Sequence, residues 1–200
     1  MQPENLTALN HYIATLRQTL ELSANLNADT ETLNAAAQQL QQLNQQLQPH
    51  TEQKPLPQFN INYGDRLSSI LPYSPISGAL NPIAPPLDVM RDEEDSTRLT
   101  ATLTLGRIYE GPPELVHGSV VAAIYDQIMA FSAVDQKVAG FTANLSVDYL
   151  AGTPLFAPLT FTSWVDSVNG KKVIVKAECH SSGTLLTRCT GLFIAFQPES

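Results

Sequence analysis

The chain has few cysteines, few basic residues and no long apolar segment. Its 200 residues include two cysteines, Cys179 and Cys189, and neither lies in the CxxC spacing of metal and redox sites. We therefore expect two small, reduced core residues. No stretch approaches the roughly 18 consecutive apolar residues of a membrane span. The N-terminus lacks the basic segment and apolar run of a secretory signal, so we expect a cytoplasmic protein with no integral membrane segment.

Basic side chains are scarce relative to acidic ones. The chain holds 11 Lys and Arg against 19 Asp and Glu, which gives a formal net charge of −8. This sign disfavours nonspecific binding to nucleic acid and to anionic membranes. An anionic small molecule would need a local basic patch. From the charge we expect no nucleic-acid partner. Because the sequence has no P-loop, GxGxxG fingerprint, GxSxG elbow or metal-ligand spacing, we also expect no metal or other cofactor.

The first of three parts, residues 1–48, has the periodicity of two helices. An apolar residue recurs every three or four positions near its start: Leu6, Leu9, Ile13, Leu16 and Leu20. Asp29 is a candidate N-cap for a second helix, with Glu31 in the favourable first turn. Positions 33, 36, 40, 43 and 47 of that helix are again apolar, on a Gln-rich background. We predict a helical hairpin that packs on the main domain or on a partner chain.

The second part, residues 49–96, is a proline-rich connector. Eight prolines exclude long helices and central strands, because proline lacks a backbone donor and restricts the residue before it. The segment SPISGALNPIAPPL, residues 74–87, is too apolar for a solvated linker, so we expect an extended chain along a surface groove. The acidic cluster at 91–95 predicts a solvated loop.

The third part, residues 97–200, has strand periodicity around one helix. Apolar and polar residues alternate from 99 to 105, which is the period of a strand. After Gly111-Pro112-Pro113, apolar residues recur at helical spacing from His117 to Ala133. Four more strand signals follow, near 141–149, 159–165, 173–179 and 185–196. Short turns such as Asn169-Gly170 join them, so one antiparallel sheet must cover one helix, an α+β fold.

Three motifs in this part resemble a known family. They are GPPELVHGSVVAAIYD, with an acid nine residues after the histidine, GFTANLSVDYLAGTP and VNGKKVIVKAEC. They are similar to the GP…HGG…D helix, the Gly-x-Thr strand and the Gly-Arg/Lys hairpin of hotdog-fold acyl-CoA thioesterases. That group contains bacterial phenylacetyl-CoA thioesterase and the human thioesterase superfamily members. The likeness covers about half the chain and does not include the N-terminal helices. It implies a sheet wrapped round a central helix, and a protein that hydrolyses acyl-CoA.

The chain departs from this family at two positions. Ser119 stands where the family has a second glycine. Gly111 stands six residues before the histidine, where phenylacetate-type members have an asparagine and the human-type branch does not. The second change removes a polar group from the predicted site.

Thioester hydrolysis needs a carbonyl polariser and an activated nucleophile. The first amides of a helix lack an intrahelical acceptor and carry partial positive charge. Gly118 opens the predicted helix, and the resemblance implies that its N–H is the oxyanion donor; the alternative is a helix start that merely tolerates glycine. His117, also in the motif, more simply fixes the helix start than performs acid–base chemistry.

Asp126 is the carboxylate that the resemblance implies for catalysis, as a general base for water or as the nucleophile itself. It lies in an otherwise apolar helix, where a buried, unpaired carboxylate is costly; the alternative is a solvent-facing Asp. In the resembling enzymes a hydroxyl at the position of Thr142 orients the nucleophile or its water. Otherwise Thr142 is an ordinary strand residue.

The spacing of these groups predicts a dimer. Gly118 and Asp126 are eight residues apart on one helix, or about 12 Å along its axis. A reacting carbonyl must sit about 3 Å from both groups, which one helix cannot arrange. If both act, Gly118 of one subunit must face Asp126 of another. We therefore expect a homodimer with two equivalent sites, as the resemblance also implies.

The candidate substrate-binding residues are Ser119, Asn144, Lys171 and Lys172. The resemblance implies basic residues near the phosphates of CoA, and the two lysines lie at a predicted hairpin tip. They could equally be solubilising lysines at a turn. The helical hairpin could cover the acyl tunnel, extend the dimer or join dimers into tetramers.

Two other functions remain open from the sequence. A non-catalytic scaffold or acyl-ligand binder is compatible with Ser119, the acidic charge and the extra helices. A hotdog hydratase or dehydratase would use a catalytic histidine in another context, which this motif does not match well.

Overall fold

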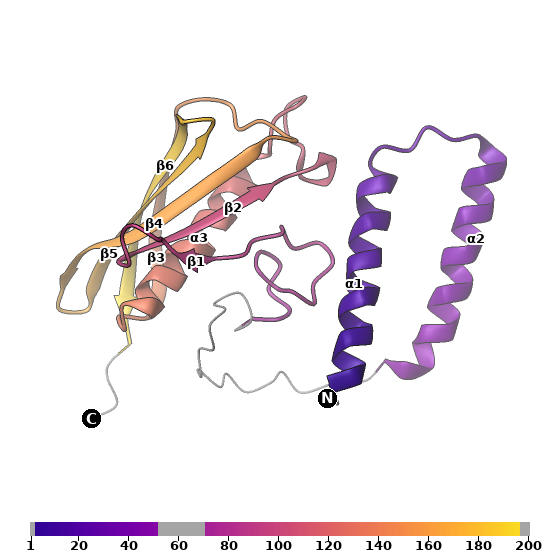
Figure 1. Ribbon diagram of the computed structural model, residues 1–200, viewed down its shortest axis with the longest axis horizontal. Coiled ribbons are helices and arrows are strands. Elements are labelled where there is room, and N and C mark those ends of the chain that lie inside the picture. Colours follow the sequence, from indigo (N-terminus) through magenta and orange to yellow (C-terminus); the bar gives the residue numbers. More distant parts are fainter. Residues whose placement is uncertain (1–2, 52–70, 197–200) are drawn as a thin grey trace.

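The computed structural model describes residues 3–51 and 71–196 (Figure 1). The described helices are α1 (Pro3–Ser23), α2 (Thr30–Leu47) and α3 (Gly118–Asp135), with short 3-10 turns η1 (Gln48–His50) and η3 (Arg107–Tyr109). The described strands are β1 (Met90–Arg91), β2 (Arg98–Thr104), β3 (Gly140–Tyr149), β4 (Pro158–Asn169), β5 (Lys172–Ser181) and β6 (Thr184–Ala195). No helix among the described residues combines the length and apolarity that crossing a membrane requires.

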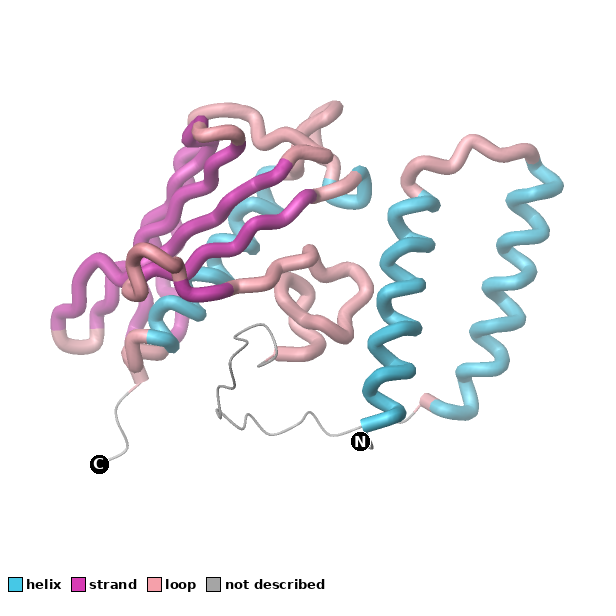
Figure 2. The backbone as a smooth tube through the Cα atoms, in the orientation of Figure 1, coloured by secondary structure: helices cyan, strands magenta, loops and turns pink. Residues whose placement is uncertain are grey.

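A single antiparallel sheet covers one central helix. Its strand order is β1-β2-β4-β5-β6-β3, and every neighbouring pair runs antiparallel. The sheet curves over α3, which contacts β2, β3, β4, β5 and β6 (Figure 2). The predicted α+β hotdog arrangement, with N-terminal helices outside it, is confirmed.

The strands form because their side chains alternate between the core and the outer face. Along β5, Val173, Val175, Ala177 and Cys179 are buried against the helix while the residues between them are less so. The turn before β5 is the predicted Asn169-Gly170, and Gly170 takes the positive φ of 56° that a tight hairpin turn requires. Both cysteines are buried and free, as predicted.

Helix α3 is largely apolar, and eight of its 18 residues are buried. Its buried polar atoms are satisfied inside the core. The Tyr125 hydroxyl lies 2.8 Å from the Thr187 carbonyl and 2.6 Å from the Thr187 hydroxyl. Ser132 and Ser163 pair through their hydroxyls at 2.6 Å. These bonds hold the middle and the end of α3 to the sheet.

Strand β3 is an edge of the sheet with an exposed surface. It pairs only with β6 among the described strands, so its outer backbone groups have no strand partner there. Phe141 is 75 % exposed and Tyr149 53 % exposed. The register with β6 shifts between Thr142 and Asn144, which marks a bulge. A long, exposed edge strand of this kind is a template for pairing with another chain.

The N-terminal helices differ in how they contact the rest of the chain. Helix α1 buries Ile13, and Arg17 donates to the carbonyls of Gly78, Ala79 and Asn81 at 2.8–3.1 Å. Helix α2 buries none of its residues, and the leucines of its apolar stripe are partly or largely exposed. The predicted N-cap is confirmed, because the Asp29 side chain accepts from the Thr32 N–H at 2.8 Å. The hairpin therefore packs on the main domain through α1.

The connector departs from the expected extended chain. Residues 71–83 fold into consecutive turns held by bonds such as Leu80 N–H to the Pro72 carbonyl at 2.8 Å. Arg17 stabilises these turns, and its contribution has no local sequence signal. The remainder of the predicted extended stretch does bury Leu87. The acidic cluster is largely a solvated turn, as predicted, although Arg91 joins β1. Residues 52–70 of the connector lie outside the described residues.

Candidate active site

One group of predicted site residues meets at the start of α3. His117 is the N-cap, and its Nδ1 accepts from the Ser119 N–H at 3.1 Å. The Ser119 hydroxyl lies 2.7 Å from the same nitrogen. Gly118 is the first residue of the helix, half-buried, with its N–H in the turn that has no intrahelical acceptor. The predicted helix start at His117 and Gly118 is confirmed in position.

A second group lies at mid-helix. The Thr142 hydroxyl donates to the Asp126 carboxylate at 2.7 Å. Asp126 is exposed, and Thr142, which is also exposed, lies near the start of β3. The bulge at Ala143 lies next to Thr142, and bulges re-aim side chains near active sites. Asp126 is therefore neither buried nor a free surface carboxylate, because it has a specific hydroxyl donor.

The two groups do not meet within one chain. Gly118 and Asp126 occupy the same helix eight residues apart, about 12 Å along the axis. Asn144, also predicted for substrate binding, lies exposed on β3 two residues beyond Thr142. Within this chain, the amide donor and the carboxylate are thus too far apart to contact one carbonyl group.

Tyr149, which the sequence did not single out as a site residue, contacts the first residue of α3. Its hydroxyl donates to the Gly118 carbonyl at 2.7 Å, and its ring lies 3.4 Å from where a Cβ on Gly118 would be. Partial burial raises the pKa of the Tyr149 phenol, which keeps this donor protonated. Its place at the end of the Gly-x-Thr strand motif was the available signal.

A hollow of about 400 Å³ opens beside Gly118. Its lining is mostly apolar and includes Leu115, Val116, Val121 and Tyr149. An apolar hollow next to unpaired helix amides can hold a ligand with an apolar tail and a carbonyl oxygen.

The two predicted basic residues, Lys171 and Lys172, lie where β5 begins. Lys171 lines a hollow of about 510 Å³ together with Lys137 and Phe196. The Phe196 ring packs edge-on against the Phe141 ring, with 4.8 Å between the ring centroids. Lys172 is exposed in the neighbouring position. This hollow combines positive charge with an aromatic surface.

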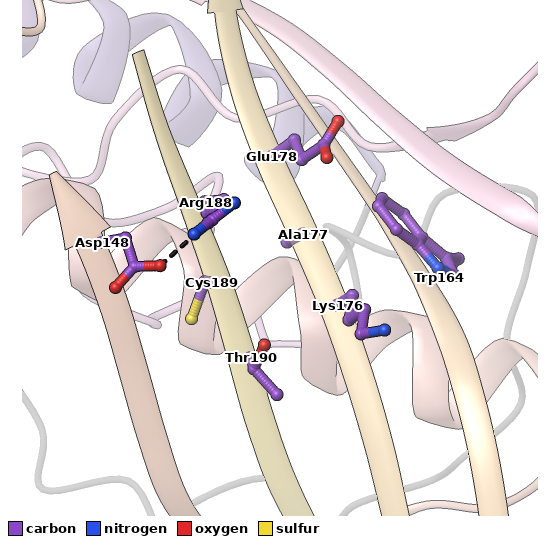
Figure 3. Close-up of a pocket in the computed structure, with 8 residues that line it drawn as sticks. All are labelled: Asp148, Trp164, Lys176, Ala177, Glu178, Arg188, Cys189 and Thr190. Atoms are coloured by element: carbon purple, nitrogen blue, oxygen red, sulfur yellow. Dashed lines mark hydrogen bonds and ion pairs between the residues drawn. The ribbon is translucent and has the colours of Figure 1, made fainter. Parts of the chain in front are cut away.

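Two further basic residues, Lys176 and Arg188, lie on the outer face of the sheet. Lys176 and Arg188 line a hollow of about 430 Å³, and Arg188 forms an ion pair with Asp148 at 2.8 Å (Figure 3). Lys176 pairs with Asp166 at 2.9 Å. Acidic partners already engage both cations. The hollow also faces away from α3, so it does not adjoin Asp126 or Gly118.

Comparison with known proteins gives a consistent pattern. The family described as Thioesterase superfamily matches residues 114–187, a span that includes both groups of site residues. Acyl-coenzyme A thioesterase THEM4 of Mus musculus is 34 % identical over 103 residues, which are 50 % of this chain and 44 % of the mouse protein. The Xenopus laevis protein of that name is 33 % identical over 103 residues, covering 50 % and 46 %.

A solved structure extends the likeness beyond that domain. The crystal structure of a thioesterase superfamily protein superimposes with a TM-score of 0.81 and 26 % identity, over 93 % of this chain and 90 % of the other. The superposition must therefore include N-terminal helical residues as well as the sheet. In contrast, the chain spans less than half the length of the THEM4 proteins it matches.

Proposed function

From the match of residues 114–187 to the thioesterase superfamily, we propose that the chain belongs to this superfamily and hydrolyses acyl-CoA thioesters to a free acid and CoA. The observation that carries the proposal is the 2.7 Å hydrogen bond from Thr142 to Asp126. It joins the two residues that the family motifs single out, one on a helix and one on a strand, 16 positions apart. The THEM4 relatives are named as acyl-coenzyme A thioesterases, which supports the same reaction class.

Asp126 supplies the activated nucleophile in this mechanism. As a general base it takes a proton from water, and the resulting hydroxide adds to the thioester carbonyl carbon. In the alternative it attacks that carbon itself and forms an anhydride that water then hydrolyses. Thr142 donates to one carboxylate oxygen and so fixes the carboxylate while leaving the other oxygen for water or substrate. Both routes release CoA as the thiol once the departing sulfur gains a proton.

Gly118 stabilises the charge that develops on the carbonyl oxygen. Its amide lies in the first turn of α3, where N–H groups lack intrahelical acceptors and the helix dipole is positive. Tyr149 holds the Gly118 carbonyl from the opposite side and so fixes this turn. A donor that is already oriented before the reaction contributes most to catalysis. The apolar hollow beside Gly118 would receive part of the acyl chain.

We propose a homodimer as the active form. The two groups lie too far apart on one helix to share a carbonyl, and β3 offers an exposed edge close to Asp126 and Thr142. Pairing through this edge would cover Phe141 and bring Gly118 of one subunit toward Asp126 of the other. A two-fold axis then generates two equivalent sites.

The CoA end of the substrate is proposed to reach the hollow with Lys137 and Lys171. Phosphates would interact with the ammonium groups, Lys172 included, and the adenine could stack on Phe196. This local positive charge would offset the net charge of −8 that opposes an anionic substrate.

The first experiment measures thiol release from acyl-CoAs, from short aliphatic to palmitoyl and phenylacetyl, for the parent and Asp126→Asn. We expect turnover by the parent and a loss of at least about a hundredfold in kcat in the variant. Asp88→Asn, a change of the same kind at an exposed connector carboxylate, is the matched control and should keep parent activity. Saturable binding of acyl-CoA without hydrolysis would instead favour the non-catalytic binder.

A mixing experiment tests the shared site. Gly118→Ala and Asp126→Asn are each expected to be inactive alone, but a heterodimer of the two contains one intact site. Random exchange at equal concentrations should restore about one quarter of the parent activity, because half the dimers are mixed and half their sites are intact. No recovery after confirmed subunit exchange would contradict a site built from two chains.

A further inference from the structure

Both positions at which the helix motif departs from the family lie against one side chain, His117. Ser119 contacts His117 Nδ1 through its amide and its hydroxyl, at 3.1 and 2.7 Å. Gly111 lies on the other side, where an added Cβ would come within 2.7 Å of the His117 Cα and 3.1 Å of its Cδ2. Any larger residue at 111 would therefore push the histidine away. The two departures together define the place of this imidazole.

The contacts at Nδ1 determine where the ring carries its proton. A backbone N–H can only donate, so Nδ1 must be the acceptor of the Ser119 amide and cannot hold a proton itself. The Ser119 hydroxyl then donates to the same nitrogen. A neutral imidazole with an unprotonated Nδ1 carries its proton on Nε2. Protonation of Nδ1 would set it against the Ser119 N–H, which can only donate, and would break this capping bond.

We propose that Ser119 is a positioning residue that holds His117 as the Nε2–H tautomer, so that the ring presents a hydrogen-bond donor at the start of α3. This proposal rests on the proposed function, because its ligand is the thioester bound beside Gly118. Nε2–H would donate to the negative charge that develops on the thioester as the nucleophile adds. The imidazole acts here as a neutral donor and transfers no proton.

The surroundings of His117 make this orientation rigid. Its own N–H donates to the Tyr109 carbonyl at 2.9 Å, and its carbonyl accepts from the Val120 N–H at 2.9 Å. With backbone and Nδ1 both held, the remaining nitrogen has a single direction to face. His117 is exposed in the single chain, and a ligand at the helix start would meet its Nε2. Glycine at position 119 would keep the amide contact and lose the hydroxyl.

The tautomer is tested by long-range proton–nitrogen correlation spectra of protein with ¹⁵N-labelled histidine. The chain has four histidines, and His117→Gln identifies the signals of His117. We expect an unprotonated Nδ1 and a protonated Nε2 in the full-length protein. In Ser119→Ala, the loss of the hydroxyl should move the Nδ1 signal toward the value of averaged tautomers. A parent spectrum with the proton on Nδ1 would overturn the proposal.

The effect on catalysis is tested with Ser119→Ala, Ser119→Gly and Ser119→Thr. We expect kcat to fall about three- to tenfold in the first two with KM within about twofold, and to recover in Ser119→Thr, which keeps the hydroxyl. Parent kcat in Ser119→Ala, or a loss that Ser119→Thr does not restore in a folded protein, would overturn the role. If the parent hydrolyses no acyl-CoA, the proposed function fails while the spectra still decide the tautomer.

Discussion

Replacing Gly118 by alanine should separate catalysis from stability. A Cβ at this position would lie 3.4 Å from Cε1, Cζ and Oη of Tyr149, which is ordinary van der Waals contact. The fold can therefore accept the methyl group. The same methyl would stand at the approach to the Gly118 amide, where we place the thioester oxygen. Alanine keeps its backbone N–H, but a carbonyl oxygen that cannot reach this donor loses its contribution, and such a loss typically lowers kcat by about 10²–10³, or about 2.7–4 kcal/mol.

The stability of this variant should change in the opposite direction. Replacing glycine by alanine inside a helix stabilises a protein by about 0.5–1 kcal/mol, and the gain is smaller at the first helical position. For a chain of 200 residues, a gain of about 0.5 kcal/mol corresponds to a rise in Tm of about 1–2 °C. Thiol release and thermal unfolding followed by circular dichroism measure the two quantities on the same sample.

Gly191→Ala is the matched control. Its Cβ would come within 2.7 Å of the Met129 side chain and 2.9 Å of Phe193, so this substitution should destabilise the core without touching the site. Parent kcat in Gly118→Ala would refute the placement of the thioester at this amide. A fall in Tm as large as that of Gly191→Ala would show that activity was lost through misfolding.

Two side-chain contacts and the burial of the cysteines have measurable consequences. Thr142→Val removes the donor to Asp126 and should lower kcat about tenfold to a hundredfold, whereas Thr142→Ser should keep the parent kcat. The unfolding free energy of both variants should stay within about 0.5 kcal/mol of the parent. Tyr125→Phe leaves Thr187 short of a buried donor and should cost about 1–3 kcal/mol in urea unfolding; an unchanged midpoint would contradict the buried bond. Burial raises the pKa of both cysteine thiols to about 12, so iodoacetamide at pH 8 should label them only in denaturant.

The sequence predicted the fold because its periodicities are local. In β5 every second residue is buried, and in α3 the buried residues recur at helical spacing. Each pattern can be read from neighbouring residues, and it predicts the type of the element and its place in the chain. Asn169-Gly170 has one favoured conformation and so also fixed a hairpin. The positions of Gly118 at a helix start and Asp126 within the helix followed from the same patterns.

Contacts between distant segments could not be predicted in this way. Periodicity alone does not show that the Thr142 hydroxyl reaches Asp126, because the bulge in β3 depends on pairing with β6; only the family resemblance implied a link between the two residues. Tyr149 reaches Gly118 across 31 positions. The turns of the connector depend on Arg17, more than 60 residues away. These contacts arise only when the chain is folded.

The link between α1 and the helix start has a consequence for the design of a minimal enzyme. The Glu21 carboxylate accepts from the Arg107 N–H at 3.1 Å, and the Tyr109 carbonyl two residues later accepts from the His117 N–H at 2.9 Å. Only the short turn η3 separates the extension from the proposed oxyanion donor. A fragment trimmed to the hotdog core would keep every motif residue and lose this brace. Shortening the protein would thus remove a support of the proposed site without changing any of its residues.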